Sequence, residues 1–325
     1  MTHPPTRPDF TVRGPIDLLA LVPFMLGFHP TDSIVVVALD DGHLIFQARG
    51  DLPEPHLVDL FAGDMAATAA RHGANSVIII GYGDPSAVAA VLAMSNAMHA
   101  AGVAVEHMLR VHRGRYWELL CEETGFPPEG IPYDLDTHEV TTRAVYSGLV
   151  ALPDREALSA RLAPLPDRPD ASVLDEQVTA LGGIRNRIGA ARRLLRKALK
   201  VYGRGDRPTD DELLLIAALM ADLRCRDEAY RMLVPGEPNR HHAALWLDAV
   251  RRAPEVYVPG VATMLAIAAW RSGDGALASV AVERALAVDP DYRLALLVGD
   301  VLQAAVPPWA LDDLNVASAR RVRSR

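Results

Sequence analysis

Two runs of aliphatic and β-branched residues constrain most strongly what this chain can fold into. Residues 33–39 have the sequence SIVVVAL, and residues 76–80 have the sequence SVIII. The first run is rich in β-branched residues and is typical of a strand, and the second is a continuous apolar run that is typical of a strand buried on both faces. Because segments of helical composition lie between the β-rich runs, the sequence predicts a mixed sheet covered by helices.

The predicted α/β domain covers residues 1–125 and has the element order β-β-α-β-α-β-β. The Asp40-Asp41-Gly42 turn follows the first run, and an Asp-Gly connection between two β-rich runs favours a hairpin. Gly73 and Gly102 end the two predicted helices. The predicted strands are 33–39, 43–48, 76–80, 103–111 and 116–121, and the predicted helices are 57–72 and 86–101.

The second half of the chain has a different composition. Residues 126–173 are rich in proline and are predicted to connect two domains, with a short helix at 137–149. Residues 174–325 are predicted to be all-α, which suggests a helical bundle or a short solenoid. The segment 260–290 resembles a tetratricopeptide repeat, because two helical stretches flank Gly-Asp-Gly and an Asp-Pro pair follows them.

The composition excludes several classes of protein. The net charge of −8 argues against a general nucleic-acid coat, although it allows a local basic patch. Two cysteines, Cys121 and Cys225, cannot make a disulfide framework, and we expect both to be packed thiols. The longest early apolar run, 18–28, is too short to span a membrane. We therefore expect a cytoplasmic protein with no membrane partner.

Three short polar segments are candidate ligand-binding loops of the α/β domain. In the first two, His29 with Asp32 could form an acid–base pair, and Arg49 with Asp51 could bind a polar ligand. The alternatives are a local turn with His29 packed beneath it, and an exposed ion pair. The candidate residues of all three segments are His29, Asp32, Arg49, Asp51, Gly81, Tyr82, Gly83 and Asp84.

The third segment, Gly81-Tyr82-Gly83-Asp84-Pro85, lies between a buried strand and a helix. Ligands of open α/β sheets bind at the carboxyl ends of strands, and a helix N-terminus favours anions. The segment lacks the complete phosphate-binding motifs. The alternative is an ordinary turn in which Asp84 caps the helix.

The segment 177–205 carries eight basic residues and no acidic residue. At helical spacing, an apolar stripe from Ile188 to Tyr202 lies opposite a basic face. Such a face could bind phosphate backbones or an acidic partner, or it could pair with the acidic residues that follow in the sequence. The candidate residues are Arg185, Arg187, Arg192, Arg193, Arg196, Lys197 and Lys200.

No catalytic motif is present. The chain has neither a Gly-x-Ser-x-Gly elbow nor a His-Glu-x-x-His sequence. Residues 134–139 contain two aspartates, a histidine and a glutamate, but their spacing matches no zinc or calcium motif, and capping by Asp136 or Thr137 explains them. We therefore predict no metal and no cofactor.

The sequence resembles a family of proteins from high-GC actinobacteria that is catalogued only as a domain of unknown function. The resemblance rests on LGFHPTDS at 26–33, RGDLP at 49–53, and WRSGDGA at 270–276 with the Asp-Pro pair that follows. It includes Trp117, Cys121 and the PPEG sequence at 127–130, but other cysteine positions of the family are not cysteine here. The resemblance implies a bacterial cytoplasmic protein and no known activity.

Three functional hypotheses follow. The first is an interaction or scaffold protein that binds a protein partner through its helical domain. The second is an enzyme, or a protein that binds a nucleotide or another phosphate-bearing ligand, with its site at 81–85. The third is nucleic-acid binding through the basic helix at 185–200. A homo-oligomer is compatible with all three.

Overall fold

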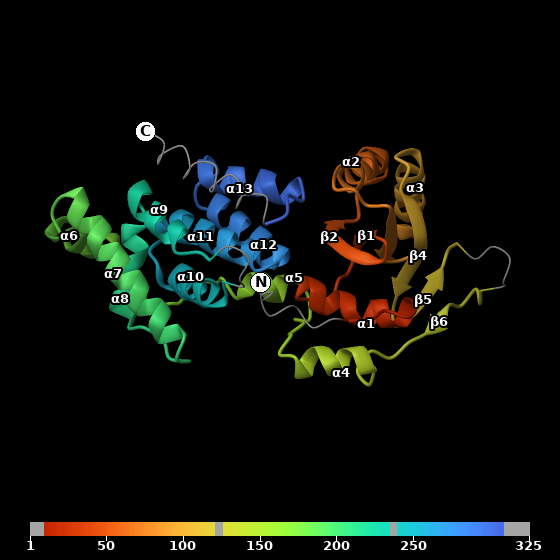
Figure 1. Ribbon diagram of the computed structural model, residues 1–325, viewed down its shortest axis with the longest axis horizontal. Helices are drawn as coiled ribbons and strands as arrows, with labels where there is room; N and C mark the ends of the chain where they lie inside the picture. The colour runs from red at the N-terminus through yellow and green to blue at the C-terminus, as the bar shows by residue number, and fades with distance from the viewer. Residues whose placement is uncertain (1–9, 121–125, 235–238, 309–325) are drawn as a thin grey trace. The chain divides into compact units, whose positions relative to one another are not determined.

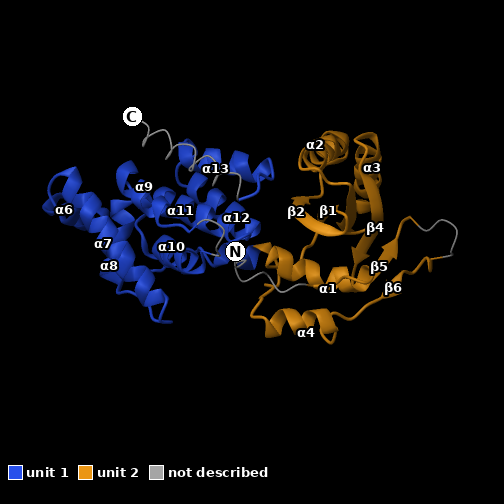
Figure 2. Ribbon diagram, in the orientation of Figure 1, with its two compact units in different colours: residues 1–6, 156–325 blue, residues 7–155 orange. Residues whose placement is uncertain are grey.

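The computed structural model describes residues 10–120, 126–234 and 239–308 of the chain. These residues form two compact units, one within residues 7–155 and one within residues 156–325 (Figure 2). The first unit contains a mixed sheet with helices, and the second is helical. The predicted change from an α/β half to a helical half is therefore confirmed.

The sheet of the first unit has six strands in the order β2-β1-β3-β4-β5-β6 (Figure 1). Only the β3–β4 pair is parallel, and the other neighbours are antiparallel. β6 is a two-residue strand that the sequence did not predict. The strands are β1 (Ser33–Asp40), β2 (His43–Asp51), β3 (Ser76–Tyr82), β4 (Ala104–His112), β5 (Arg115–Glu118) and β6 (Ile131–Pro132).

The two apolar runs form neighbouring strands of this sheet. β1 is buried from Ser33 to Leu39, and all seven residues of β3 are buried. Asp41 and Gly42 join β1 to β2 with positive φ angles of 48° and 76°, as a tight hairpin turn requires. The predicted hairpin and the strand buried on both faces are both confirmed.

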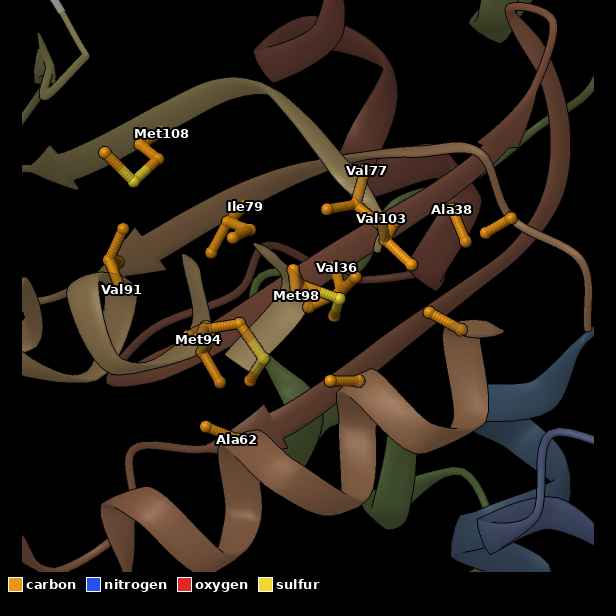
Figure 3. Close-up of a cluster of buried hydrophobic side chains, with 14 of the residues drawn as sticks. Val36, Ala38, Ala62, Val77, Ile79, Val91, Met94, Met98, Val103 and Met108 are labelled. Atoms are coloured by element: carbon orange, nitrogen blue, oxygen red, sulfur yellow. The ribbon is translucent and has the colours of Figure 1, made fainter. Parts of the chain in front are cut away.

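Helices α2 (Val58–Arg71) and α3 (Ala87–Ala100) cover one face of the sheet (Figure 1). Alternate residues of β1 and β3 point into this layer, where they meet alanines of α2 and methionines of α3. Figure 3 shows Met94 and Met98 of α3 between the strands and Ala62 of α2. Small residues on α2 allow this helix to lie close to the sheet.

Helix α1 (Pro15–Leu26) lies on the opposite side of the sheet from α2 and α3 (Figure 1). The Gln47 side chain of β2 donates a hydrogen bond of 2.8 Å to the carbonyl oxygen of Met25. The helix ends at Leu26, and Gly27 caps it with a left-handed φ of 79°. The early apolar run is therefore a buried helix and a turn.

The proline-rich region contains β6 and the short helices α4 (Glu139–Tyr146) and α5 (Arg155–Ala160). His138 caps α4 by accepting a hydrogen bond from the Val140 amide. This differs from the predicted cap at Asp136 or Thr137. The Asp134 side chain instead accepts bonds from the Asp136 amide and the Thr137 hydroxyl, and so orders the preceding turn.

The second unit is built around α11, of which every residue except the last is buried. A helix that is apolar on all sides must be enclosed by others. α11 and α12 form an antiparallel pair, and Asp274 caps α12 through the Leu277 amide at 3.0 Å. The helices are α6 (Ala171–Ala180), α7 (Ile184–Tyr202), α8 (Asp210–Leu219), α9 (Leu223–Arg231), α10 (Arg240–Arg252), α11 (Val258–Arg271), α12 (Gly275–Leu286) and α13 (Arg293–Gln303).

Candidate functional site

Several candidate residues of the α/β unit meet at one edge of the sheet. The Leu52 amide donates a bond of 3.0 Å to the Asp32 carbonyl oxygen. A Cβ atom added to Gly83 would lie 3.7 Å from a carboxylate oxygen of Asp32. The start of β1 and the ends of β2 and β3 therefore lie together, a question that the sequence left open.

Arg49 is held by contacts within its own unit. Its guanidinium lies 2.5 Å from the Asp51 carboxylate, donates to the Thr31 carbonyl oxygen at 3.3 Å, and lies over the Phe28 ring at 5.9 Å. The Asp51 side chain is 84% exposed, so this ion pair adds at most about 1 kcal/mol to stability. The geometry fits the ion-pair alternative.

His29 is exposed at this edge. Its amide donates to the Leu152 carbonyl oxygen at 2.9 Å, which fixes the backbone of the segment. Among the described residues, no hydrogen bond or ion pair joins the side chains of His29 and Asp32. The structure therefore does not form the predicted acid–base pair, and His29 is not packed beneath the turn.

Backbone amides in the loop at 81–85 and directly after it already donate hydrogen bonds within the chain. The Gly83 amide donates to Val111, and the Ser86 amide donates to the Asp84 carboxylate at 2.8 Å. The Ala87 amide donates to the Asp84 carbonyl oxygen at 3.1 Å. Asp84 thus orders the turn, but Ser86 is the residue that precedes α3. These amides have acceptors within the chain, so they are not open donors for a phosphate.

Packing explains the glycine at position 81, and Tyr82 is buried within the unit. A Cβ atom at Gly81 would lie 2.7 Å from a methyl group of Val91, so glycine allows α3 to pack on β3. Tyr82 is buried, and burial raises the pKa of its phenol well above its usual range, with a further contribution from Tyr133. Its hydroxyl and that of Ser33 have no hydrogen-bond partner in the described part of the chain.

Arg110 and His112 at the end of β4 belong to the same edge, and they were not predicted as site residues. Hydrogen bonds from Ser86 lower the pKa of the Asp84 carboxyl most, and the charges of His112 and Arg110 lower it further. Both side chains therefore lie near Asp84. The pairing of β3 with β4 in parallel places their carboxyl ends together, which a single sequence does not reveal.

Arg110 lies on an indole that the chain holds in place. Its guanidinium carbon is 3.7 Å from the centre of the Trp117 ring. The Trp117 Nε1 group donates to the Pro128 carbonyl oxygen at 2.9 Å. A Cβ atom at Gly130 would lie 2.5 Å from the same ring. The Trp and Pro-Pro-x-Gly elements of the sequence thus form one contact, whereas Cys121 lies outside the described residues.

Metal binding finds no support among the described residues, which contain no group of three or more His, Cys, Asp or Glu side chains that could hold an ion. His107 pairs with Glu118 at 2.7 Å on one face of the sheet. His138 lies 3.4 Å from Asp17. Cys225 is a buried free thiol, and burial raises its pKa to about 11.

The candidate basic residues of the second unit all lie on α7. Its buried positions are Ala190, Ala191, Leu195 and Ala198, which confirms an apolar side that packs inward. Three of the seven cations have partners within the unit. The Arg192 guanidinium binds Glu228 at 2.8 Å, Lys197 pairs with Glu212, and Arg187 donates to the Gly182 carbonyl oxygen at 2.9 Å.

The other four cations of α7 are exposed. In the part of the chain that the structure describes, their side chains form no hydrogen bond and no ion pair. We call these four residues the α7 basic row: Arg185, Arg193, Arg196 and Lys200. A hollow of about 300 Å³ lies beside Arg185 at the start of the helix. The acidic residues of α8 and α9 therefore neutralise only part of this helix.

A family model matches residues 15–309, which include both units and nearly all the residues discussed above. The chain belongs to the family described as Domain of unknown function (DUF4192). The family assignment confirms the resemblance to a domain of unknown function and brings no activity with it. No curated protein and no solved structure matches this DUF4192 chain. Among its described residues, no helix combines the length and apolar character needed to cross a membrane.

Proposed function

We propose that this DUF4192 chain is an interaction protein whose helical unit binds the acidic surface of a protein partner through the α7 basic row. The observation that carries the proposal is the row itself. Four exposed cations lie on one helix, and none has an acidic partner among the described residues. The row is an unusual concentration of positive charge for a chain whose net charge is −8.

Of the acidic residues that follow α7 in the sequence, Asp210 and Glu212 are engaged elsewhere, whereas Asp206 and Asp211 form no ion pair in the described part of the chain. Asp210 pairs with Arg252 at 2.7 Å and also with Arg207. Glu212 and Glu228 bind the two α7 cations that are not part of the row. Like charges three or four residues apart on a helix destabilise it by a few tenths of a kcal/mol, and an acidic partner would offset this cost.

The helical unit supplies a rigid support for such a surface. We propose that α11 and α12 form a tetratricopeptide-like pair, since they pack as an antiparallel hairpin closed by the Asp274 cap. Because α7 buries its apolar side in the same unit, its basic side is held in a fixed orientation. We propose a cytoplasmic location for this scaffold.

Charge reversal on the row tests the proposal. The triple variant Arg193→Glu, Arg196→Glu and Lys200→Glu is compared in the native host with a control triple of the same charge. The control carries glutamate at three exposed arginines elsewhere in the helical unit, which are Arg161, Arg240 and Arg293. We expect the row variant to lose its co-purifying proteins and the control to keep them. Equal recovery by both variants would refute the assignment of the row.

Nucleic-acid binding is the second candidate, and the spacing of the row favours it. Arg193, Arg196 and Lys200 follow one another along a helical face at intervals of roughly 4.5 and 6 Å, given 1.5 Å of rise per residue. Regularly spaced cations can neutralise successive phosphates. Gel-shift titration with duplex DNA and with RNA tests this candidate, and no binding at low salt would remove it.

A further inference from the structure

Arg110 is an arginine whose donors are unused. A guanidinium carries five N–H donors, and partly buried polar groups normally find acceptors. In the described part of the chain, Arg110 forms no hydrogen bond and no ion pair, and its Nε atom is buried without a partner. Burial lowers the pKa of this group, and the charge of Asp84 offsets this effect only in part.

The guanidinium is nevertheless fixed in place. It lies 3.7 Å from the centre of the Trp117 ring, at a distance where the ring attracts a cation. The Trp117 ring is itself held by the Pro128 carbonyl oxygen and by the close approach of Gly130. A planar group whose orientation is fixed before binding loses less entropy when it takes a ligand.

His112 lies two residues further along β4 and therefore on the same face of the sheet. Arg115 pairs with His112 across the β4–β5 hairpin, but its guanidinium donates to the Glu129 and Gly130 carbonyl oxygens. Arg110 and His112 thus remain as two neighbouring donors without acceptors in the described chain. They lie at the carboxyl end of the parallel strand pair, where α/β proteins bind ligands.

Asp84 is an acidic group whose charge acts on Arg110 and His112, but its carboxylate already has donors of its own. The Ser86 amide and hydroxyl donate to one of its carboxylate oxygens at 2.8 and 2.5 Å. The Asp84 carboxylate and the Arg110 guanidinium form no ion pair in the described part of the chain, although the Asp84 charge acts on Arg110. The Asp84 charge therefore affects the attraction of the site for anions, but its carboxylate does not occupy the position proposed for the ligand.

We propose that Arg110 and His112 bind the anionic oxygens of a small molecule, a carboxylate or a phosphate, at the carboxyl end of β3 and β4. Arg110 donates two parallel hydrogen bonds to a pair of oxygens, as guanidinium groups do with both classes of anion. His112 donates a third from the same face. This site is separate from the α7 basic row and does not depend on the function proposed for it.

Amide chemical shifts of the full ¹⁵N-labelled chain test the site. Inorganic phosphate and succinate are titrated separately, at constant ionic strength, into the wild-type protein. We expect saturable shifts at 81–86 and 108–113, with at least one of the two anions. Saturation with phosphate alone or succinate alone identifies the class of ligand. The absence of saturable shifts with both anions up to about 50 mM would overturn the proposal.

Variants distinguish a specific binding site from nonspecific electrostatic attraction of anions. Arg110→Gln should weaken binding at least tenfold, and Arg110→Lys should weaken it less, because it keeps the charge without the planar fork. Arg113→Gln, at the exposed turn of the same hairpin, removes the same charge and should change binding less than twofold. Asp84→Asn should tighten binding, because it removes a nearby negative charge. Equal weakening by the variants at 110 and 113 would contradict the proposal, and well-dispersed spectra show that each variant is folded.

Discussion

Substitution of Gly130 by alanine tests how the α/β unit holds Trp117 and Arg110. Gly130 has a φ of +74°, and a Cβ atom there would lie 2.5 Å from Cε2 and 2.7 Å from Cζ2 of Trp117. The left-handed backbone costs a non-glycine residue about 1–2 kcal/mol. Overpacking against a ring that cannot retreat adds about 1–3 kcal/mol. Gly130→Ala should therefore destabilise the unit by about 2–5 kcal/mol.

Gly114→Ala is the matched control for this substitution. Gly114 has a φ of +71°, but nothing lies within 4 Å of the position that its Cβ atom would take. Its substitution should cost only the backbone term of about 1–2 kcal/mol. The difference between the two variants isolates the contact with Trp117.

Native-state hydrogen exchange measures this difference within the α/β unit alone. Peptides from β4 and β5 report the opening free energy of the strands that carry Arg110 and Trp117. Tryptophan fluorescence provides a second readout, since Trp117 is the one tryptophan among residues 7–155. Equal losses of stability in Gly130→Ala and Gly114→Ala would refute the reasoning, because the Trp117 contact would then carry no strain.

Three further predictions concern packing, pH and salt. Gly81→Ala should destabilise the packing of α3 on β3 by about 1–3 kcal/mol, because the added Cβ atom would lie 2.7 Å from Val91. Urea unfolding measures this loss. Gly63→Ala is the control and should not destabilise α2, because its Cβ atom would point into open space. Burial lowers the pKa of His242 from 6.5 to about 4. Between these two pH values, the unfolded chain therefore binds a proton at His242 that the folded chain does not bind. Stability of the helical unit should therefore fall by up to about 3 kcal/mol as the pH drops from 6.5 to 4, and His242→Gln should flatten this dependence of the urea midpoint; an unchanged slope would contradict it. If nucleic acid occupies the α7 basic row, four phosphate contacts should give a slope of about −3.6 for log K against log salt concentration, and a slope near zero would exclude this mode.

Local patterns predicted the elements of the α/β unit well. The Asp-Gly turn, the fully apolar strands and the glycines that end helices act within a few residues, so the sequence contains the information directly. β6 was missed because it has only two residues, which pair with Arg115 and Tyr116 of β5 from a separate part of the chain. Pairing of that kind depends on the tertiary fold.

The candidate sites also divide into features that local sequence patterns predict and features that depend on the tertiary fold. The sequence identified the loops at Asp32 and Gly83 as separate candidates, and only the pairing of β1 with β3 brings them together. Arg110 and His112 were missed, because only the parallel pairing of β3 and β4 brings them to that edge. The direction of the basic face of α7 follows from helical periodicity, but the acids that occupy Arg192 and Lys197 come from other helices.

Site-specific photo-crosslinking in the native host tests the central claim most directly. A photoreactive residue replaces Arg196 in the α7 basic row, and in a second strain it replaces Arg161, which is also exposed in the same unit. We predict a discrete crosslinked product from position 196 that is destroyed by protease, resists nuclease and disappears in high salt. No product at 196, or the same products from both positions, would contradict the claim that this row is the partner-binding surface.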